Sequence, residues 1–305
     1  MKLGLLTAPF PGTPLLEVAD WAAANGFRAV EVCAWPAQEG ASRRYGGVCH
    51  LDVDTITPDS AQQLVGQLAE RGIVISALGY YPNPLDRDPT TREYVAAHQR
   101  KVVDAAALLG VSVVNTFFGA DQTRTQAENL KAGREPLAAL VGHARDRGVK
   151  VGIENCPMIF STDEWPAGQN AMYNPAAWRE VFGWFDDDTL GLNLDPSHLI
   201  WQQIDVERVV REFGPRLHHV HLKDLEIDRE GLYEHGVMSA GIGWQVPRLP
   251  GLGQVHWGRF FAALYRAGYD GPVVIEHEDR DFEGSDERVK AGFLLARDAV
   301  QGWVV

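Results

Sequence analysis

The stretch Arg147-Gly148-Val149-Lys150-Val151-Gly152-Ile153-Glu154-Asn155 combines the features that decide the fold. Before it lies a long amphipathic pattern over residues 125–147, and Gly148 is a residue type that commonly follows the end of a helix. The short apolar, β-branched run that comes next is typical of a strand covered on both faces in a parallel sheet. The run ends on an acidic residue, Glu154. The stretch therefore predicts a helix, a turn and a buried strand that ends in a charged group.

The same order of helical pattern, glycine and apolar run recurs along the chain. Glycine separates the two patterns at Gly26, Gly72, Gly110, Gly148 and Gly268. The predicted strands cover residues 3–8, 29–34, 73–79, 112–118, 149–155, 190–195, 217–223 and 272–277. The predicted helices cover about 13–25, 59–71, 91–109, 125–147, 175–185, 206–213, 257–267 and 285–300. Strands that alternate with helices in this way are typical of a parallel α/β sheet.

Eight strand–helix units within 305 residues predict an α/β fold, a single (β/α)8 TIM barrel. The rival is a doubly wound open sheet, which usually has fewer strands, and no GxGxxG motif follows the first predicted strand. We expect one catalytic barrel domain over residues 1–305, with a long loop insert at about 225–256. The active groups of such barrels lie at the carboxyl ends of the strands, so the residues that end the predicted strands are the candidates for chemistry.

The composition is that of an ordinary globular protein, with 45% hydrophobic and 23% charged residues. A net charge of −13 repels a phosphate backbone and argues against nucleic acid as a partner. No apolar stretch approaches the roughly 18 residues of a membrane span, and no targeting segment is visible. The cysteines Cys33, Cys49 and Cys156 are odd in number and form no CxxC motif. We therefore expect a cytoplasmic protein with reduced thiols and no membrane partner.

The last four strands each end in a group that can bind a metal ion. These groups are Glu154, Asp195, His221 and Glu276. Three carboxylates gathered in a partly desolvated barrel mouth repel one another strongly unless a counter-charge is present. Three hard oxygens and one imidazole suit Mn²⁺, Mg²⁺ or Co²⁺, with Zn²⁺ or Fe²⁺ as alternatives. The spacing therefore predicts a divalent metal site, with Mn²⁺ as the first expectation.

Each of these residues also has an ordinary interpretation when taken alone. A glutamate at a strand end is usually solvated or caps a helix. Asp195 precedes Pro196 and can simply form a turn, and His221 can be a packed core histidine. Because four such coincidences at one end of one barrel are much rarer than one, we favour the metal site.

Ordered motifs around these residues give the chain a resemblance to a known family. The motifs are Gly152-Ile153-Glu154-Asn155, Asp195-Pro196-Ser197-His198, His219-Val220-His221, Arg248-Leu249-Pro250-Gly251-Leu252-Gly253 and Val274-Ile275-Glu276. With them, essentially the whole chain resembles the sugar phosphate isomerase/epimerase superfamily of xylose-isomerase-like TIM barrels. That superfamily also contains ketose 3-epimerases, inosose dehydratases and endonuclease IV.

The resemblance implies that the same four residues are the metal ligands. It also implies that Glu154 and Glu276 are acid/base groups on opposite faces of the substrate, and that His198 and Arg248 hold substrate oxygens. A cation that polarises a carbonyl makes the adjacent carbon acidic enough for a carboxylate to deprotonate it. We expect a metal-dependent sugar isomerase or epimerase that forms an enediolate from a keto sugar. No phosphate cup is visible near the last two strands, so we expect a non-phosphorylated substrate.

Lys223 supports an alternative activity. It lies two residues after His221 and is predicted to share its strand face. The Lys223-Asp224 pair resembles the inosose dehydratase branch more than the ketose 3-epimerase branch. A lysine in the pocket can protonate a leaving oxygen, which would give a metal-dependent lyase or dehydratase acting on a keto-cyclitol or 3-keto-glycoside by β-elimination. An ordinary ion pair of Lys223 with a nearby acid is equally compatible with the sequence.

Two further classes are weaker. An endonuclease IV-like nuclease would need a histidine-rich multi-zinc site and a basic groove, and a sugar-binding protein without catalysis would not need both glutamates. Asn115 and Tyr81 are predicted to bind substrate, and Glu31 is a further lining candidate. The Gly-rich insert predicts a lid or an oligomer contact. From the resemblance we expect a homo-oligomer, and a small partner subunit is an open alternative.

Overall fold

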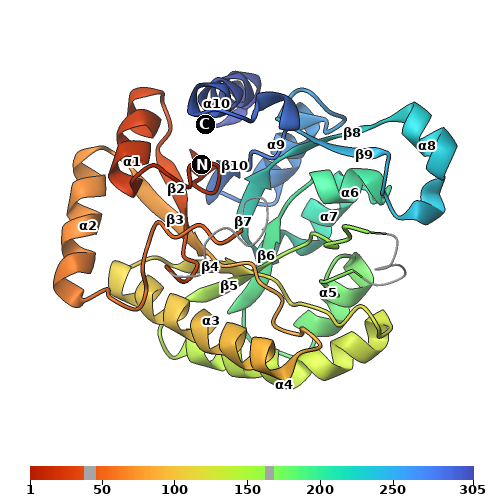
Figure 1. The fold of residues 1–305 in the computed structure, drawn as a ribbon, viewed down its shortest axis with the longest axis horizontal. Coiled ribbons are helices and arrows are strands. Elements are labelled where there is room, and N and C mark those ends of the chain that lie inside the picture. The colour runs from red at the N-terminus through yellow and green to blue at the C-terminus, as the bar shows by residue number, and fades with distance from the viewer. Residues whose placement is uncertain (38–45, 162–167) are drawn as a thin grey trace.

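Eight parallel strands close into a barrel at the centre of the molecule (Figure 1). The structure is a computed structural model and describes residues 1–37, 46–161 and 168–305. The barrel strands are β1 (Lys2–Leu6), β2 (Ala29–Cys33), β3 (Val74–Gly79), β4 (Val113–Thr116), β5 (Lys150–Glu154), β6 (Leu190–Leu194), β7 (Leu217–Leu222) and β10 (Pro272–Ile275). They match the eight predicted strands to within a few residues, so the predicted TIM barrel is confirmed.

Helices surround the barrel on its outside (Figure 1). Those that follow the predicted pattern are α1 (Leu15–Ala24), α2 (Pro58–Glu70), α3 (Pro89–Leu109), α4 (Gln126–Arg145), α5 (Pro175–Phe182), α7 (Val206–Phe213), α9 (Trp257–Arg266) and α10 (Asp286–Val300). Local signals set their ends. Thr125 and Glu128 form a capping box at the start of α4, and Gly110, with a φ of 66°, ends α3.

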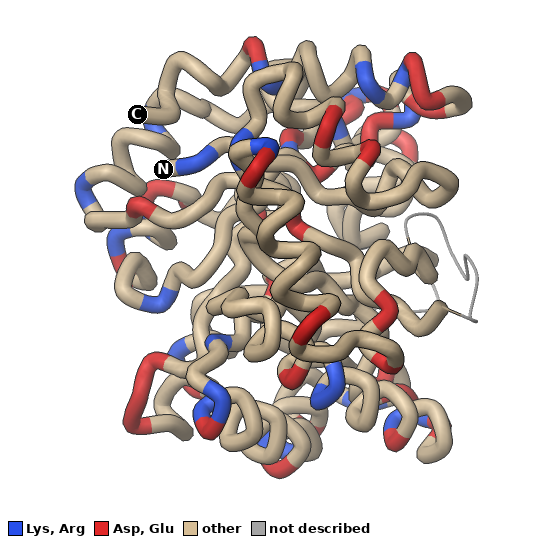
Figure 2. Tube along the Cα trace, turned by 90° about the vertical axis from the view of Figure 1, so that its left-hand side faces the viewer, with Lys and Arg blue, Asp and Glu red and all other residues tan. Residues whose placement is uncertain are grey.

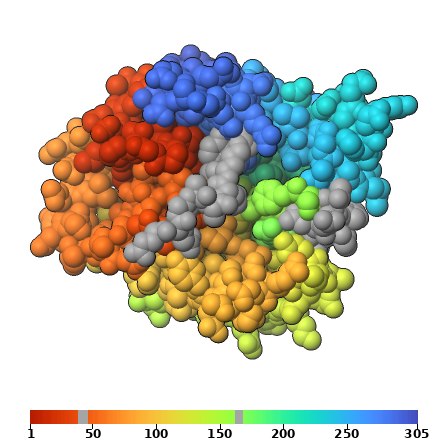
Figure 3. All heavy atoms as spheres, in the orientation of Figure 1, coloured from red at the N-terminus to blue at the C-terminus, as the bar shows by residue number. Residues whose placement is uncertain are grey.

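The two ends of the chain meet where the barrel closes. Strand β1 pairs with β10 in parallel, with Lys2 opposite Pro272 and Leu5 opposite Ile275. Figure 3 shows the first and last segments, in red and blue, side by side. Because closure joins segments from opposite ends of the sequence, the barrel mouth forms only when the whole sheet is in register.

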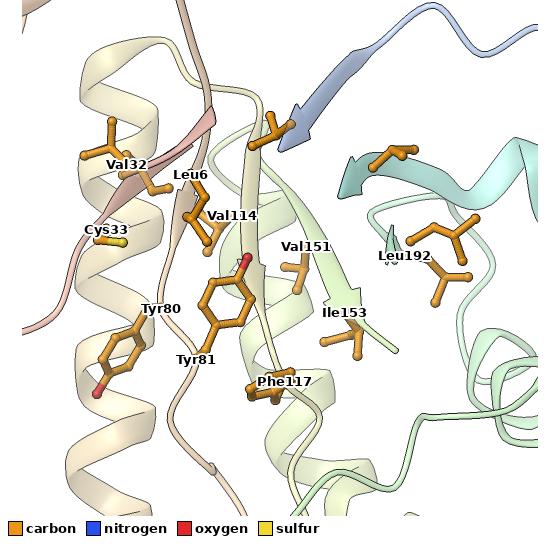
Figure 4. Close-up of a cluster of buried hydrophobic side chains, with 14 of the residues drawn as sticks. Leu6, Val32, Cys33, Tyr80, Tyr81, Val114, Phe117, Val151, Ile153 and Leu192 are labelled. Carbon is orange, nitrogen blue, oxygen red and sulfur yellow. The ribbon is translucent and has the colours of Figure 1, made fainter. Parts of the chain in front are cut away.

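Apolar side chains from several strands hold the sheet in that register. Figure 4 shows Leu6, Tyr81 and Ile153, which come from or follow different strands, turned toward a common region. All three are buried. Burying one large apolar side chain contributes roughly 1.5–3 kcal/mol, so this packing fixes the strand ends that carry the polar groups.

The segment between β7 and α9 contains more regular structure than the loop that the sequence predicted. Strands β8 (Asp224–Ile227) and β9 (Gln245–Arg248) form an antiparallel hairpin. A short helix, α8 (Arg229–His235), and a single 3-10 turn, η3 (Val237–Ser239), connect them at the edge of the molecule (Figure 1). These elements are short, and α8 and η3 bury no residue. The sequence therefore shows no hydrophobic periodicity that would predict them.

The buried carboxylate of Asp224 holds the base of this hairpin. Its Oδ1 accepts the backbone N–H groups of Leu225 at 2.9 Å and Val255 at 2.8 Å. Its Oδ2 accepts the N–H of Gly251 at 3.0 Å and the indole N–H of Trp257 at 2.9 Å. One side chain thus fixes both the start of the hairpin and the turn that returns the chain to the barrel.

Acidic and basic residues are interspersed along the chain trace in the view of Figure 2. Cys33, Cys49 and Cys156 are free thiols, as predicted. Within the described residues, no helix has the length and apolar character needed to cross a bilayer.

We predict that Asp224→Ala destabilises the protein by more than about 3 kcal/mol, because it leaves several buried donors without an acceptor. Asp228→Ala is the matched control on the same hairpin. Asp228 only caps α8 through the N–H of Glu230, so its loss costs about 1 kcal/mol. Urea unfolding measures the loss of stability in both variants. Equal destabilisation would contradict the role of Asp224 at the base of the hairpin.

Candidate active site

Four polar residues meet at the carboxyl end of the barrel because neighbouring strands carry them there. Glu154 is the last residue of β5, Asp195 follows β6, His221 lies near the end of β7 and Glu276 follows β10. One donor atom from each lies within 4.8 Å of the others; the side chains of Glu154, Asp195 and His221 are buried, and that of Glu276 is 12% exposed. The structure thus brings together the four residues that the sequence predicted to converge.

The imidazole of His221 is held between two carboxylates. Its Nε2 lies 2.7 Å from Glu31 Oε2, and its Nδ1 lies 3.1 Å from Glu276 Oε2. Burial disfavours the charged ring, but Glu31 and Glu276 outweigh it and raise the pKa of His221 well above its usual range. Tyr81 in turn donates its hydroxyl to Glu31. A carboxylate that orients one ring nitrogen while the other faces the ligand cluster is typical of metal-binding histidines.

The ammonium group of Lys223 lies among the same acids. Its Nζ is 2.8 Å from Glu276 Oε2, 3.0 Å from Asp195 Oδ2 and 3.1 Å from Glu278 Oε2. Burial disfavours the charged form, but Asp195, Glu276 and Glu278 raise the pKa of Lys223 well above its usual range. The structure thus shows the ion pair of Lys223 with nearby acids, and the role of Lys223 as a proton donor stays a prediction.

The acidic groups differ in how readily they hold a proton. Burial, together with the charge of Glu276, raises the pKa of Glu154. Burial acts in the same direction on Glu276, but Lys223 and His221 outweigh it and lower the pKa of Glu276 to about 2. Lys223 and His198 likewise lower the pKa of the buried Asp195. Two neighbouring carboxyls whose pKa values are pushed apart are the usual setting for an acid and a base.

The donor set fits a divalent cation. Carboxylate oxygens and an imidazole are ligands that Mn²⁺, Zn²⁺ and similar ions accept, and the buried groups carry more negative charge than Lys223 alone offsets. The described residues contain two further groups of three close potential ligands, which are Glu31, His219 and His221, and Glu154, Cys156 and His198. Burial lowers the pKa of His219 to about 4, and its ring forms hydrogen bonds with Asn193 and Ser76, so His219 is packed inside the barrel.

Two adjoining cavities lie at this end of the barrel. The inner cavity has a volume of about 80 Å³, and its lining includes Glu154, Glu276, Lys223 and Tyr81. The outer cavity has a volume of about 610 Å³, and its lining includes His198 and Arg248. Four residues line both cavities, namely Cys156, Met158, Phe160 and Glu278.

Three of the four predicted substrate-binding residues line these cavities. His198 Nε2 lies 3.0 Å from Asp195 Oδ2 and 3.3 Å from Glu154 Oε1. Arg248, in β9, donates to Asp281 at 2.6 Å and to Asp279 at 3.3 Å. Tyr81 faces the inner cavity. Asn115 is completely buried and lines neither cavity, so its contact with a substrate stays a prediction.

The contact between Glu31 and His221 was not predicted. The sequence named Glu31 only as a lining candidate at the end of the second strand. Strands β2 and β7 are not neighbours in the sheet, so the pairing crosses the barrel. The sequence signal that could have indicated this contact was an acidic residue within an otherwise apolar strand.

Comparison with known proteins identifies the family. The family model described as "Xylose isomerase-like TIM barrel" matches residues 19–299, and the chain belongs to this family. Its members include metal-dependent sugar epimerases and dehydratases that act on small sugar substrates. The predicted resemblance is thereby confirmed.

Three curated proteins illustrate the breadth of the family. "Uncharacterized protein YfiH" of Bacillus subtilis (strain 168) is 28% identical over 92% of this chain and 93% of its own length. "Ketose 3-epimerase" of Arthrobacter globiformis is 26% identical over 68% of this chain and 65% of its own length. "Inosose dehydratase" of Geobacillus thermodenitrificans (strain NG80-2) is 33% identical over 57% of this chain and 72% of its own length.

We predict that Mn²⁺ added to chelator-treated protein raises the melting temperature. A concentration one hundred times the dissociation constant adds about 2.7 kcal/mol of stability. Asp195→Ala abolishes the increase and the bound metal found by elemental analysis, whereas His198→Ala retains both. If His198→Ala abolished both effects and Asp195→Ala retained them, the ion would be assigned instead to the group that contains Cys156 and His198.

Lys223→Met tests how the ammonium charge of Lys223 affects stability without the metal and affinity for it. Because Lys223 Nζ contacts two of the four candidate ligands, its removal leaves the metal-free site short of positive charge, and stability falls by about 3 kcal/mol. The same change frees both carboxylates, so we expect Mn²⁺ to bind at least about tenfold more tightly. Calorimetric titration measures the affinity, and weaker binding would show instead that Lys223 organises the ligands.

Proposed function

We propose that this protein is a divalent-metal-dependent sugar isomerase or epimerase that removes a proton next to the carbonyl of a non-phosphorylated keto sugar. The observation that carries the proposal is the convergence of Glu154, Asp195, His221 and Glu276 at the carboxyl end of the barrel, where one donor atom of each lies within 4.8 Å of the others. Two of these groups, Glu154 and Glu276, are carboxyls whose pKa values shift in opposite directions. An ionised carboxylate next to a more readily protonated one provides a base and an acid at the same substrate carbon.

We propose Glu154, Asp195, His221 and Glu276 as the metal ligands, with Mn²⁺ as the first expectation. A divalent cation bound there would polarise the substrate carbonyl and make the adjacent carbon–hydrogen bond more acidic. Membership of a metal-dependent family and the close approach of the four donor groups support this assignment.

In the proposed reaction, the carboxylate of Glu276 accepts the proton from the substrate carbon. Glu154 then delivers a proton to the same carbon from the other face, which inverts the stereocentre. Delivery to the neighbouring carbon would give isomerisation. Both carboxyls return to their starting states by exchanging protons with water, so hydrogen from the solvent enters the product. His198, near Glu154, and Arg248, in the outer cavity, are proposed to hold substrate oxygens.

A lyase is the second candidate, and Lys223 favours it. Its buried ammonium contacts the proposed base at 2.8 Å, so it is close enough to protonate an oxygen that leaves from the next carbon. Proton abstraction by Glu276 followed by loss of that oxygen would be a β-elimination on a keto-cyclitol or 3-keto-glycoside. The similarity to an inosose dehydratase supports this alternative. A cytoplasmic location, a homo-oligomeric state and a small partner subunit stay predictions.

Reaction in deuterated water tests the proposal and separates the two outcomes. An epimerase or isomerase incorporates deuterium into a sugar that otherwise keeps its composition, whereas a lyase product has lost water or an aglycone. Glu154→Gln and Glu276→Gln should each lower kcat at least about a hundredfold. Glu70→Gln, on the outer helix α2, is the control and should leave kcat unchanged. Unaltered turnover in both active-site variants would refute the acid/base assignment.

A further inference from the structure

The outer cavity is much larger than the cavity that contains the acidic residues. Its volume is about 610 Å³, against about 80 Å³ for the inner one. At roughly 30 Å³ for each water molecule in the liquid, the outer cavity corresponds to about twenty waters. Because the two cavities share part of their lining, a substrate whose reacting carbon lies at Glu154 and Glu276 has room to extend outward.

The wall of the outer cavity combines apolar surface with hydrogen-bonding groups. Trp201 and Pro247 contribute apolar surface, and Gln245 contributes an amide. The indole N–H of Trp201 is buried and has no hydrogen-bond partner among the described residues. A hydroxyl-bearing ring matches such a wall, because its carbon–hydrogen face packs against the indole while its hydroxyls meet the polar groups.

The charges around the outer cavity disfavour an anionic occupant. Three acids, Glu278, Asp279 and Asp281, line it together with two arginines, Arg248 and Arg280. The guanidinium of Arg248 already donates to Asp279 and Asp281. A phosphate there would compete with these carboxylates for the arginine and meet their repulsion. The cavity therefore suits a neutral group.

The hairpin strand β9 supplies Gln245, Val246, Pro247 and Arg248 to this wall, and buried carboxylates hold it in place. Asp279 accepts the N–H of Leu249 at 3.1 Å, directly after the strand. A wall that is already fixed loses little conformational entropy when a ligand binds.

We infer that the outer cavity is a second subsite for a neutral group joined to the reacting sugar through a glycosidic bond. The substrate is then a keto-glycoside or keto-disaccharide rather than a free keto sugar. This inference rests on the proposed function and adds the substrate class to it.

A matched pair of substrates tests the inference. Methyl 3-keto-glucoside and a 3-keto-disaccharide carry the same reacting ring, and only the second can fill the outer cavity. We expect kcat/KM in deuterated water, followed by deuterium uptake or by elimination, to be at least about tenfold higher for the disaccharide. Equal values, or a preference for the methyl glycoside, would overturn the inference.

Variants of the cavity wall test whether the outer cavity causes the expected preference for the disaccharide. Val246→Trp fills the outer cavity, and Gln245→Ala is a milder change should the larger side chain disturb folding. Either should lower kcat/KM for the disaccharide several-fold more than for the methyl glycoside, whereas equal losses would count against a second subsite. Tyr233→Ala, at an 83% exposed position of α8 on the same hairpin, is the control and should leave both values unchanged.

A binding measurement keeps this inference separate from the proposed reaction. Calorimetry of the metal-loaded protein with the non-reacting methyl glucoside and the corresponding disaccharide reports on the cavity alone. If neither keto substrate reacts but the disaccharide binds more tightly and Val246→Trp removes the difference, the proposed function fails and the subsite stands. If the two bind equally, the subsite is refuted whatever the reaction.

Discussion

The mutual repulsion of buried carboxylates at one end of the barrel is the constraint on which the rest of the site depends. Glu154, Asp195 and Glu276 approach one another because neighbouring parallel strands end there, and apolar packing prevents the strands from separating. Lys223 and His221 offset part of the negative charge. The remaining excess of negative charge explains why a divalent cation fits the cluster. The contacts of Lys223 and His221 with Glu276 explain why the pKa of Glu276 is lowered while that of Glu154 is raised.

The sequence predicted the barrel and the convergence of the four polar residues because both follow from local repetition. Each strand pattern ends in its own polar group, and parallel strands bring those ends together. The contact between Glu31 and His221 has no such local origin, since it crosses the barrel between strands that are not paired. The ion pairs of Lys223 likewise depend on side-chain packing, so the sequence left its two roles open. Asn115 was predicted to bind substrate, but its position near a strand end did not place it at either cavity.

The hairpin between β7 and α9 adds a wall that the barrel strands do not provide. The central cluster depends on the strands, whereas the large outer cavity depends on β9 and the loops around it. Asp224 and Asp279, both fully buried, fasten this added wall to the barrel through backbone N–H groups. The polar cluster and the outer cavity therefore belong to separately built parts of the molecule, and the sequence predicted the first part far more clearly than the second.

Anomalous X-ray diffraction from a crystal soaked with Mn²⁺ shows whether a divalent cation binds among the clustered carboxylates. We expect one strong anomalous peak per chain, about 2.0–2.4 Å from oxygens of Glu154, Asp195 and Glu276 and from a nitrogen of His221. A fully loaded crystal with no peak there, or with the ion bound elsewhere and Lys223 still bridging the carboxylates, would contradict this expectation.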